Sequence, residues 1–112
     1  NPGMISVLYL DHALGRLLEV GIDRIEDHNR DLAERITVGL EGLEQKLISS
    51  ATRLHRSGNT CFVTADAHGL CEALAERGVL VWGDHGRVRV SGHLYNDSDD
   101  VDRLLVALED LV

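Results

Sequence analysis

Several features that would assign this 112-residue chain to a functional class are missing from it. No apolar run approaches the roughly 20 residues of a membrane-spanning helix, and the first residues lack the basic, apolar and small-residue order of a signal peptide. Positive charge is scarce, since 11 Lys and Arg residues oppose 19 Asp and Glu. The resulting net charge of -8 repels nucleic acid and anionic lipid surfaces. We therefore expect a cytoplasmic protein that binds neither nucleic acid nor a membrane.

Cysteine is also rare. Cys61 and Cys71 are ten residues apart without a second pair, which suggests neither a zinc-binding spacing nor a disulfide framework. Both fall on expected core faces, and free cysteine is among the most buried residue types. We expect two reduced, buried thiols.

Patterns of nucleophilic catalysis are absent as well: there is no Ser-His-Asp order, nucleophile elbow or glycine-rich phosphate loop. Among six histidines, only His85 and His93 form a plausible pair, because they flank the last expected strand, with Asp84 as the candidate third ligand. Single histidines on loops are mostly solvated. We therefore expect no metal site.

The composition, 44% hydrophobic and 27% charged, is that of a globular protein, and the length suits one domain with one core. Apolar residues recur at helical spacing over residues 4–20, and Gly21 supplies a stop. A second pattern, from Ile25 to Leu47, predicts a helix of about seven turns, long enough to bridge two bodies. Residues 1–48 are thus expected to be helical.

Residues 59–112 predict a β-α-β-β-α unit. Strands are expected at residues 59–65, 79–82 and 87–91, the last two separated by a hairpin loop at 83–86. Asp66 and Asp97 are expected to cap the two helices, and Gly78 to end the first of them. Because crossovers are right-handed, the third strand fits between the other two.

The expected fold is therefore a single α+β domain. Two N-terminal helices precede a three-stranded antiparallel or mixed sheet of order 1-3-2, covered by helices on one face. Residues 46–49 or 53–55 are the candidates for a fourth strand at the sheet edge.

The strand at residues 87–91 alternates between two faces. Val88 and Val90 share one face, and Arg87, Arg89 and Ser91 share the other. If helices cover the valine side, Arg89 is open to a ligand, and a guanidinium on a rigid strand suits two-point capture of a carboxylate. A simply solvated strand face is the alternative. Trp82, beside the hairpin, could line a pocket or a subunit contact, or belong to the core.

Residues 87–112 (RVRVSGHLYNDSDDVDRLLVALEDLV) resemble the C-terminal end of class V aminotransferases, the pyridoxal-phosphate enzymes that include cysteine desulfurases and selenocysteine lyases. Residues 73–79 with 81–82 look like the family's helix-to-strand segment, and residues 21–25 like the start of its long interdomain helix. The matching positions in the C-terminal stretch are Arg89, Ser91, Tyr95, Asn96, Asp97, Asp99, Asp100 and Val101, Asp102, Arg103, Leu104.

The resemblance implies a small domain that folds over a large, cofactor-binding domain, in a homo-oligomeric enzyme acting on an amino acid. It also implies that Arg89 clamps the substrate carboxylate, with Trp82, His85 and His93 as further candidates near the substrate. Pyridoxal 5'-phosphate would belong to the intact parent enzyme and not to this chain alone.

Two positions depart from the family pattern. The family's Schiff-base lysine follows a His in the large domain, whereas the only lysine here is Lys46, without that context. Desulfurases carry a nucleophilic Cys on the loop between the last two strands, and residues 83–86 contain none. The residues Trp82, Gly83, Asp84 and His85 resemble instead a less characterised desulfurase-like branch.

The leading hypothesis is thus the substrate-binding small domain of such an enzyme, inactive by itself. A free-standing regulatory or assembly module that binds an amino acid or dimerises is the alternative. An isolated chain would expose the apolar stripe of residues 4–20, so we expect it to self-associate through its N-terminal helices.

Overall fold

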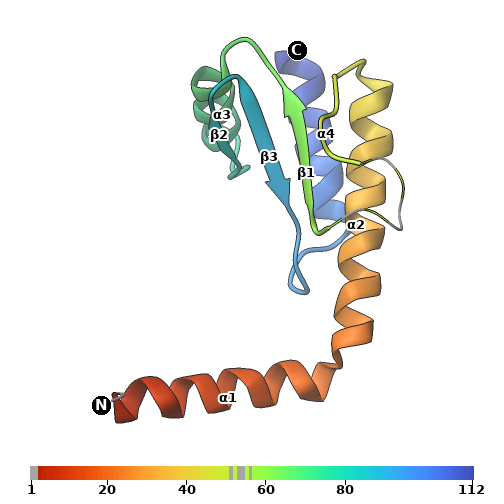
Figure 1. Cartoon of the computed structure of the whole chain (residues 1–112). Coiled ribbons are helices and arrows are strands. Elements are labelled where there is room, and N and C mark those ends of the chain that lie inside the picture. Colours follow the sequence, from red (N-terminus) through yellow and green to blue (C-terminus); the bar gives the residue numbers. More distant parts are fainter. Residues whose placement is uncertain (1–2, 51, 53–54, 56) are drawn as a thin grey trace.

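The computed structural model describes residues 3–50, 52, 55 and 57–112, and its elements follow the expected order. Figure 1 shows the sheet with helices packed against it and one helix extending away from this body. The elements are α1 (Met4–Val20), α2 (Ile22–Gly42), β1 (Asn59–Val63), α3 (Ala67–Glu76), β2 (Trp82–Asp84), β3 (Arg87–Ser91) and α4 (Ser98–Leu111).

The three strands form an antiparallel sheet in the order β1-β3-β2, which confirms the predicted topology. Along the outer edge of β1, the Ile48 N–H donates to Cys61 O (3.0 Å) and the Val63 N–H donates to Lys46 O (2.9 Å). Leu47 pairs with Phe62 only as an isolated bridge, so residues 46–49 do not form a full fourth strand. The other candidate, residues 53–55, includes residues 53 and 54, which lie outside the described part of the chain.

One face of the sheet is covered by helices and carries the core. Val88 and Val90 of β3, with Thr60 and Phe62 of β1, are buried, whereas Arg87, Arg89 and Ser91 are exposed. The predicted alternation is therefore confirmed. The core joins Phe62 to buried residues of α2, α3 and α4, among them Leu32, Ile36, Leu40, Leu74, Leu104 and Leu108.

The second helix is shorter than its apolar pattern predicts, because α2 ends at Gly42 after 21 residues. Glu44 adopts a left-handed φ of 59°, and the Gln45 N–H donates to Leu40 O (2.9 Å) while the Glu44 N–H donates to Glu41 O (3.0 Å). These bonds form a Schellman motif, which satisfies the last helical carbonyls. Leu43 and Leu47 follow the end of the helix but still pack against the core, which explains why both are apolar.

The predicted strand at residues 79–82 is displaced, and β2 occupies Trp82–Asp84 instead. Gly78 (φ 79°) ends α3, and the Val79 N–H donates to Leu74 O (2.9 Å), so residues 79–81 serve as a connection rather than a strand. The loop between β2 and β3 shrinks to His85 and Gly86, both at positive φ (51° and 74°), which is the geometry of a type I′ hairpin turn.

No residue of α1 is buried. In Figure 1 this helix (red to orange) projects from the N-terminal end of α2, and Gly21, at φ 97°, lies between the two. None of the helices among the described residues combines the length and the apolar character that crossing a membrane requires.

Candidate functional site

Arg89 lies at the centre of the open sheet face, where three strands contribute one residue each to a row. Across the strands it is paired in register with Cys61 on β1 and with Trp82 on β2. The Arg89 guanidinium carbon lies 5.2 Å from the centre of the Trp82 ring, within the range of a cation–π contact. Trp82 is 46% exposed, so it belongs to this open surface and not to the core.

This row forms the floor of a shallow hollow of about 390 Å³. Two arginines and no acid line it; the full lining is Ile48, Ser49, Cys61, Trp82, Arg87 and Arg89. Within the described part of the chain, no carboxylate comes within 4.0 Å of the side-chain nitrogens of Arg87 or Arg89. The hollow is therefore a cationic site in an acidic chain, and a volume of this size is in the ~300–1,000 Å³ range of small-molecule sites.

Cys61 corrects the prediction of a core thiol. It lies between the buried Thr60 and Phe62 and faces the open side, where it is partly exposed. The period of two in the burial of β1 would have identified this face from sequence, because Phe62 is the obvious core residue of the strand. Ser49, whose hydroxyl accepts a hydrogen bond from the Cys61 N–H (3.1 Å), also lay outside the predicted site.

Cys71 is also free and partly exposed rather than buried. It packs beside the core on α3, and burial raises the pKa of its thiol, which disfavours the reactive thiolate. Of the two cysteines, Cys61 alone lies in the hollow.

His85 occupies the hairpin tip and does not line the hollow. Its ring nitrogen Nε2 lies 3.3 Å from Asp84 Oδ2, while His68 Nε2 on α3 lies 3.2 Å from Asp84 Oδ1. The His85 backbone N–H donates to Asp84 Oδ1 (2.8 Å), and this bond is the main reason that the pKa of Asp84 falls below its usual value.

His93 lies beyond the opposite end of β3, where its ring stacks on Tyr95 at 5.7 Å. Since β3 separates His85 from His93, the two cannot share one metal ion. Nowhere in the described ranges do three or more His, Cys, Asp or Glu side chains gather in a way that could hold a metal.

Pyridoxal phosphate would need a lysine and a phosphate-binding group near Arg89. The lining of the hollow contains no lysine, and Lys46 is an exposed residue of the stretch along the β1 edge. The described residues therefore do not fit a complete cofactor site by themselves.

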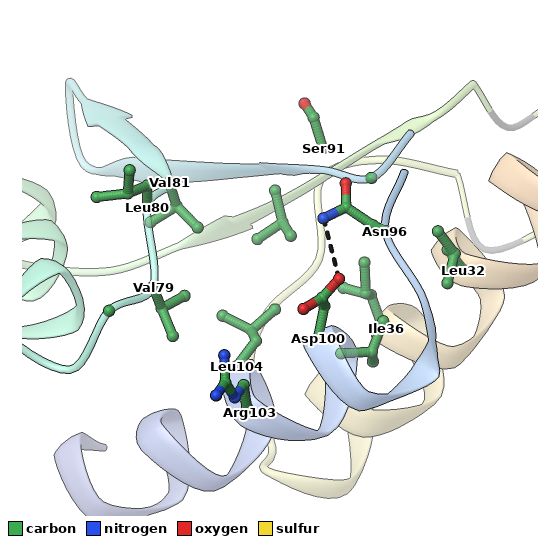
Figure 2. Close-up of a pocket in the computed structure, with 14 residues that line it drawn as sticks. Leu32, Ile36, Val79, Leu80, Val81, Ser91, Asn96, Asp100, Arg103 and Leu104 are labelled. Atoms are coloured by element: carbon green, nitrogen blue, oxygen red, sulfur yellow. Dashed lines mark hydrogen bonds between the residues drawn. The ribbon is translucent and has the colours of Figure 1, made fainter. Parts of the chain in front are cut away.

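A second cavity, of about 150 Å³, lies on the helix-covered side of the sheet. Figure 2 shows Val79, Leu80 and Val81 along one side of it, and Asn96 with Asp100 opposite, joined by a hydrogen bond from Asn96 Nδ2 to Asp100 Oδ2 (3.2 Å). Residues 79–81 line this cavity and precede β2, although the sequence predicted a strand there.

The helix-backed sheet of order β1-β3-β2 is the fold expected for the class that residues 87–112 resemble, the cysteine desulfurase-like enzymes. A search against protein-family models found no match. The chain is similar to a probable cysteine desulfurase of Pyrococcus abyssi, with 30% identity over 127 aligned positions covering 100% of this chain and 32% of the relative.

The structure is similar to that of the apo cysteine desulfurase from Thermococcus onnurineus NA1. The TM-score is 0.78 at 27% identity, over 84% of this chain and 27% of the other. These two findings confirm the resemblance expected from sequence, and the chain spans about a third of the length of the curated relative it matches.

Proposed function

We propose that this chain is the substrate-binding small domain of a pyridoxal-phosphate-dependent enzyme of the class V aminotransferase type, which acts on an amino acid. The observation that carries the proposal is Arg89 on the open sheet face, beside Trp82, in a hollow without acidic residues. The similarity to two cysteine desulfurases supports it.

In this proposal, Arg89 binds the α-carboxylate of the substrate. The strand fixes its backbone and the Trp82 ring supports its guanidinium, so little side-chain freedom is lost when the ligand binds. Holding the substrate in one orientation speeds a reaction without any bond being made to the arginine. The proposed site contains Arg89 and Trp82 and leaves out His85 and His93, which lie away from the hollow.

Pyridoxal phosphate, when bound, supplies the electron sink for reactions at the substrate's Cα. A large domain beyond this chain would hold the cofactor, because Lys46 lies along the outer edge of β1 and not in the hollow. The chain alone is accordingly expected to be inactive.

The test is Arg89→Ala in the protein expressed from the complete reading frame. Most turnover with amino-acid substrates should be lost, while the absorbance of the bound cofactor stays normal, because Arg89 is assigned to the substrate and not to the cofactor. Arg24→Ala, which removes an arginine from the first turn of α2 that does not line the hollow, is the matched control. Unchanged kinetics of the Arg89 variant would overturn the assignment.

The alternative is a free-standing module that binds an amino acid or dimerises, which the open sheet face also suits. The coding sequence upstream of Asn1 separates the two. A continuous open frame that encodes a His-Lys pair after a strand supports the enzyme, and a start codon close to Asn1 supports the module.

A further inference from the structure

We propose that the hollow on the open face selects an amino acid that carries a second anionic group on its side chain. Arg89 binds the α-carboxylate, and Arg87 binds the side-chain anion. The inference rests on the proposed function of Arg89 and adds the chemical class of the substrate.

Arg87 and Arg89 are placed to act on one ligand. They are two residues apart on β3 and share its open face, so their Cα atoms are about 6.6 Å apart along the strand. Both line the same hollow. Their long side chains can therefore reach two anionic groups of one small molecule.

Arg87 and Arg89 lack an acidic partner that several other arginines of the chain have. Arg30 Nη2 lies 2.8 Å from Glu26, Arg77 Nη1 lies 2.8 Å from Asp110, and Arg35 Nη2 lies 3.8 Å from Asp102. Arg87 and Arg89 have no such contact within the described residues, although acids outnumber bases by 19 to 11. Two adjacent guanidinium groups repel each other, and a ligand with two negative charges relieves that repulsion.

Asp84 is an acid that could compete for Arg87, since the two are paired in register across β2 and β3. Both of its oxygens have other neighbours: Oδ1 accepts from the His85 N–H (2.8 Å) and lies 3.2 Å from His68 Nε2, and Oδ2 lies 3.3 Å from His85 Nε2. Asp84 therefore leaves Arg87 available to a ligand.

Ser49 adds a neutral group to the same hollow. Its oxygen accepts from the Cys61 N–H (3.1 Å), which leaves its own O–H as a donor for an anionic oxygen. With Trp82 beside Arg89, the hollow offers two cations, one hydroxyl and one aromatic wall, a set that matches a small molecule with two anionic groups better than an amino acid with a neutral side chain.

The experiment compares ligands of nearly equal shape and different charge. The isotope-labelled protein from the complete reading frame is titrated with L-aspartate and with L-asparagine, and with L-glutamate and L-glutamine, while amide NMR shifts of β1, β2 and β3 are followed. We expect the acidic amino acid of at least one pair to bind about fivefold more tightly, near the upper limit for an exposed ion pair.

Three variants assign the effect to its residues. Arg87→Gln should abolish the preference for the acid and leave the affinity for the amide unchanged, whereas Arg89→Gln should weaken both. Arg24→Gln makes the same change of charge on α2 and should alter neither. Equal affinities for acid and amide in both pairs, or a preference that survives Arg87→Gln, would overturn the inference.

The same data keep the two proposals apart. If Arg89→Gln weakens the binding of both ligands while Arg87→Gln changes nothing, the assignment of Arg89 to the α-carboxylate is supported. The proposal of a second anionic group on the substrate is then wrong. If Arg89→Gln leaves the affinity for both ligands unchanged, the clamp itself is wrong. If no amide of the sheet shifts at the highest soluble ligand concentration, both are wrong.

Discussion

Gly83 of strand β2 lies in close contact with helix α3. A Cβ at this position would lie 2.5 Å from Cys71 Sγ and 3.1 Å from the backbone oxygen of Ala67. The glycine therefore permits a close contact, although the sequence suggested a loop residue. Its backbone lies within β2, and the turn itself uses His85 and Gly86.

Gly83→Ala should destabilise the fold by about 1–3 kcal/mol, because the added methyl overpacks a contact that includes rigid backbone. Urea unfolding followed by circular dichroism measures the loss. Gly42→Ala is the control, since nothing lies within 4 Å of its Cβ position. Adding Cys71→Ala to Gly83→Ala should restore part of the lost stability, and equal midpoints for Gly83→Ala and Gly42→Ala would contradict the contact.

Arg89 and Cys61 show what residue patterns reveal and conceal. The alternation of β3 placed Arg89 on the open face from sequence alone, because Val88 and Val90 identify the buried side without ambiguity. Cys61 was assigned to the core by its residue type, and only the register with Arg89 places it beside the arginines. Cross-strand neighbours depend on the register of strand pairing, which no local pattern contains.

Helix α4 begins with a capping box, in which the side chains of Asp97 and Asp100 each accept a hydrogen bond from the backbone N–H of the other residue. The Asp100 N–H donates to Asp97 Oδ1 (3.1 Å), and the Asp97 N–H donates to Asp100 Oδ2 (3.1 Å). This second bond is the main reason that the pKa of Asp100 falls below its usual value. Sequence predicted the Asp97 cap, because a capping residue acts on amides only two or three positions away.

Asp100→Asn should lower the melting temperature at neutral pH more than Asp99→Asn, which removes a charge from the same helical turn but no capping bond. Because folding lowers the pKa of Asp100, its carboxylate stabilises the fold above the unfolded value near 3.8, and this contribution disappears as the pH falls through the lower folded value. The two variants should therefore converge in strong acid. Thermal melts across the acidic range measure this, and a gap independent of pH would argue against the bond.

The sequence correctly predicted a long second helix, but the predicted length was wrong. Helical periodicity continues to Leu47, but the left-handed Glu44 turns the chain after Gly42. Leu43 and Leu47 remain apolar because they pack against the same core from the following segment. A buried segment looks the same in sequence whether it is helical or not, so the pattern could not locate the end of α2.

At the scale of the whole molecule, the dominant feature is the separation of α1 from the rest. The molecule extends 47 × 28 × 23 Å, and its long dimension reflects this projecting helix (Figure 1). Many apolar side chains of α1 are more than half exposed, among them Met4, Ile5, Leu8, Leu10 and Leu18. A surface of this kind requires a covering partner, which we propose to be the large domain of a longer enzyme.

Without that partner, the chain is expected to self-associate through α1 and α2, as measured by sedimentation equilibrium. Leu10→Glu with Leu14→Glu should weaken the association at least tenfold, since each leucine contributes about 1.5–3 kcal/mol when fully buried. Val106→Glu, at an exposed apolar position on α4, should leave it unchanged. A wild-type chain that stays monomeric at all concentrations would contradict the role given to α1.

The amino-acid sequence by itself determined the order of the elements, the two aspartate caps, the sheet topology and the open face that carries Arg89. These features depend on neighbours a few positions apart and on the handedness of a short crossover. Only the tertiary structure decided where β2 begins, that Cys61 joins Arg89 and Trp82, and that Arg87 has no acidic partner among the described residues. Those depend on register and on packing between segments distant in sequence, which local periodicity does not encode.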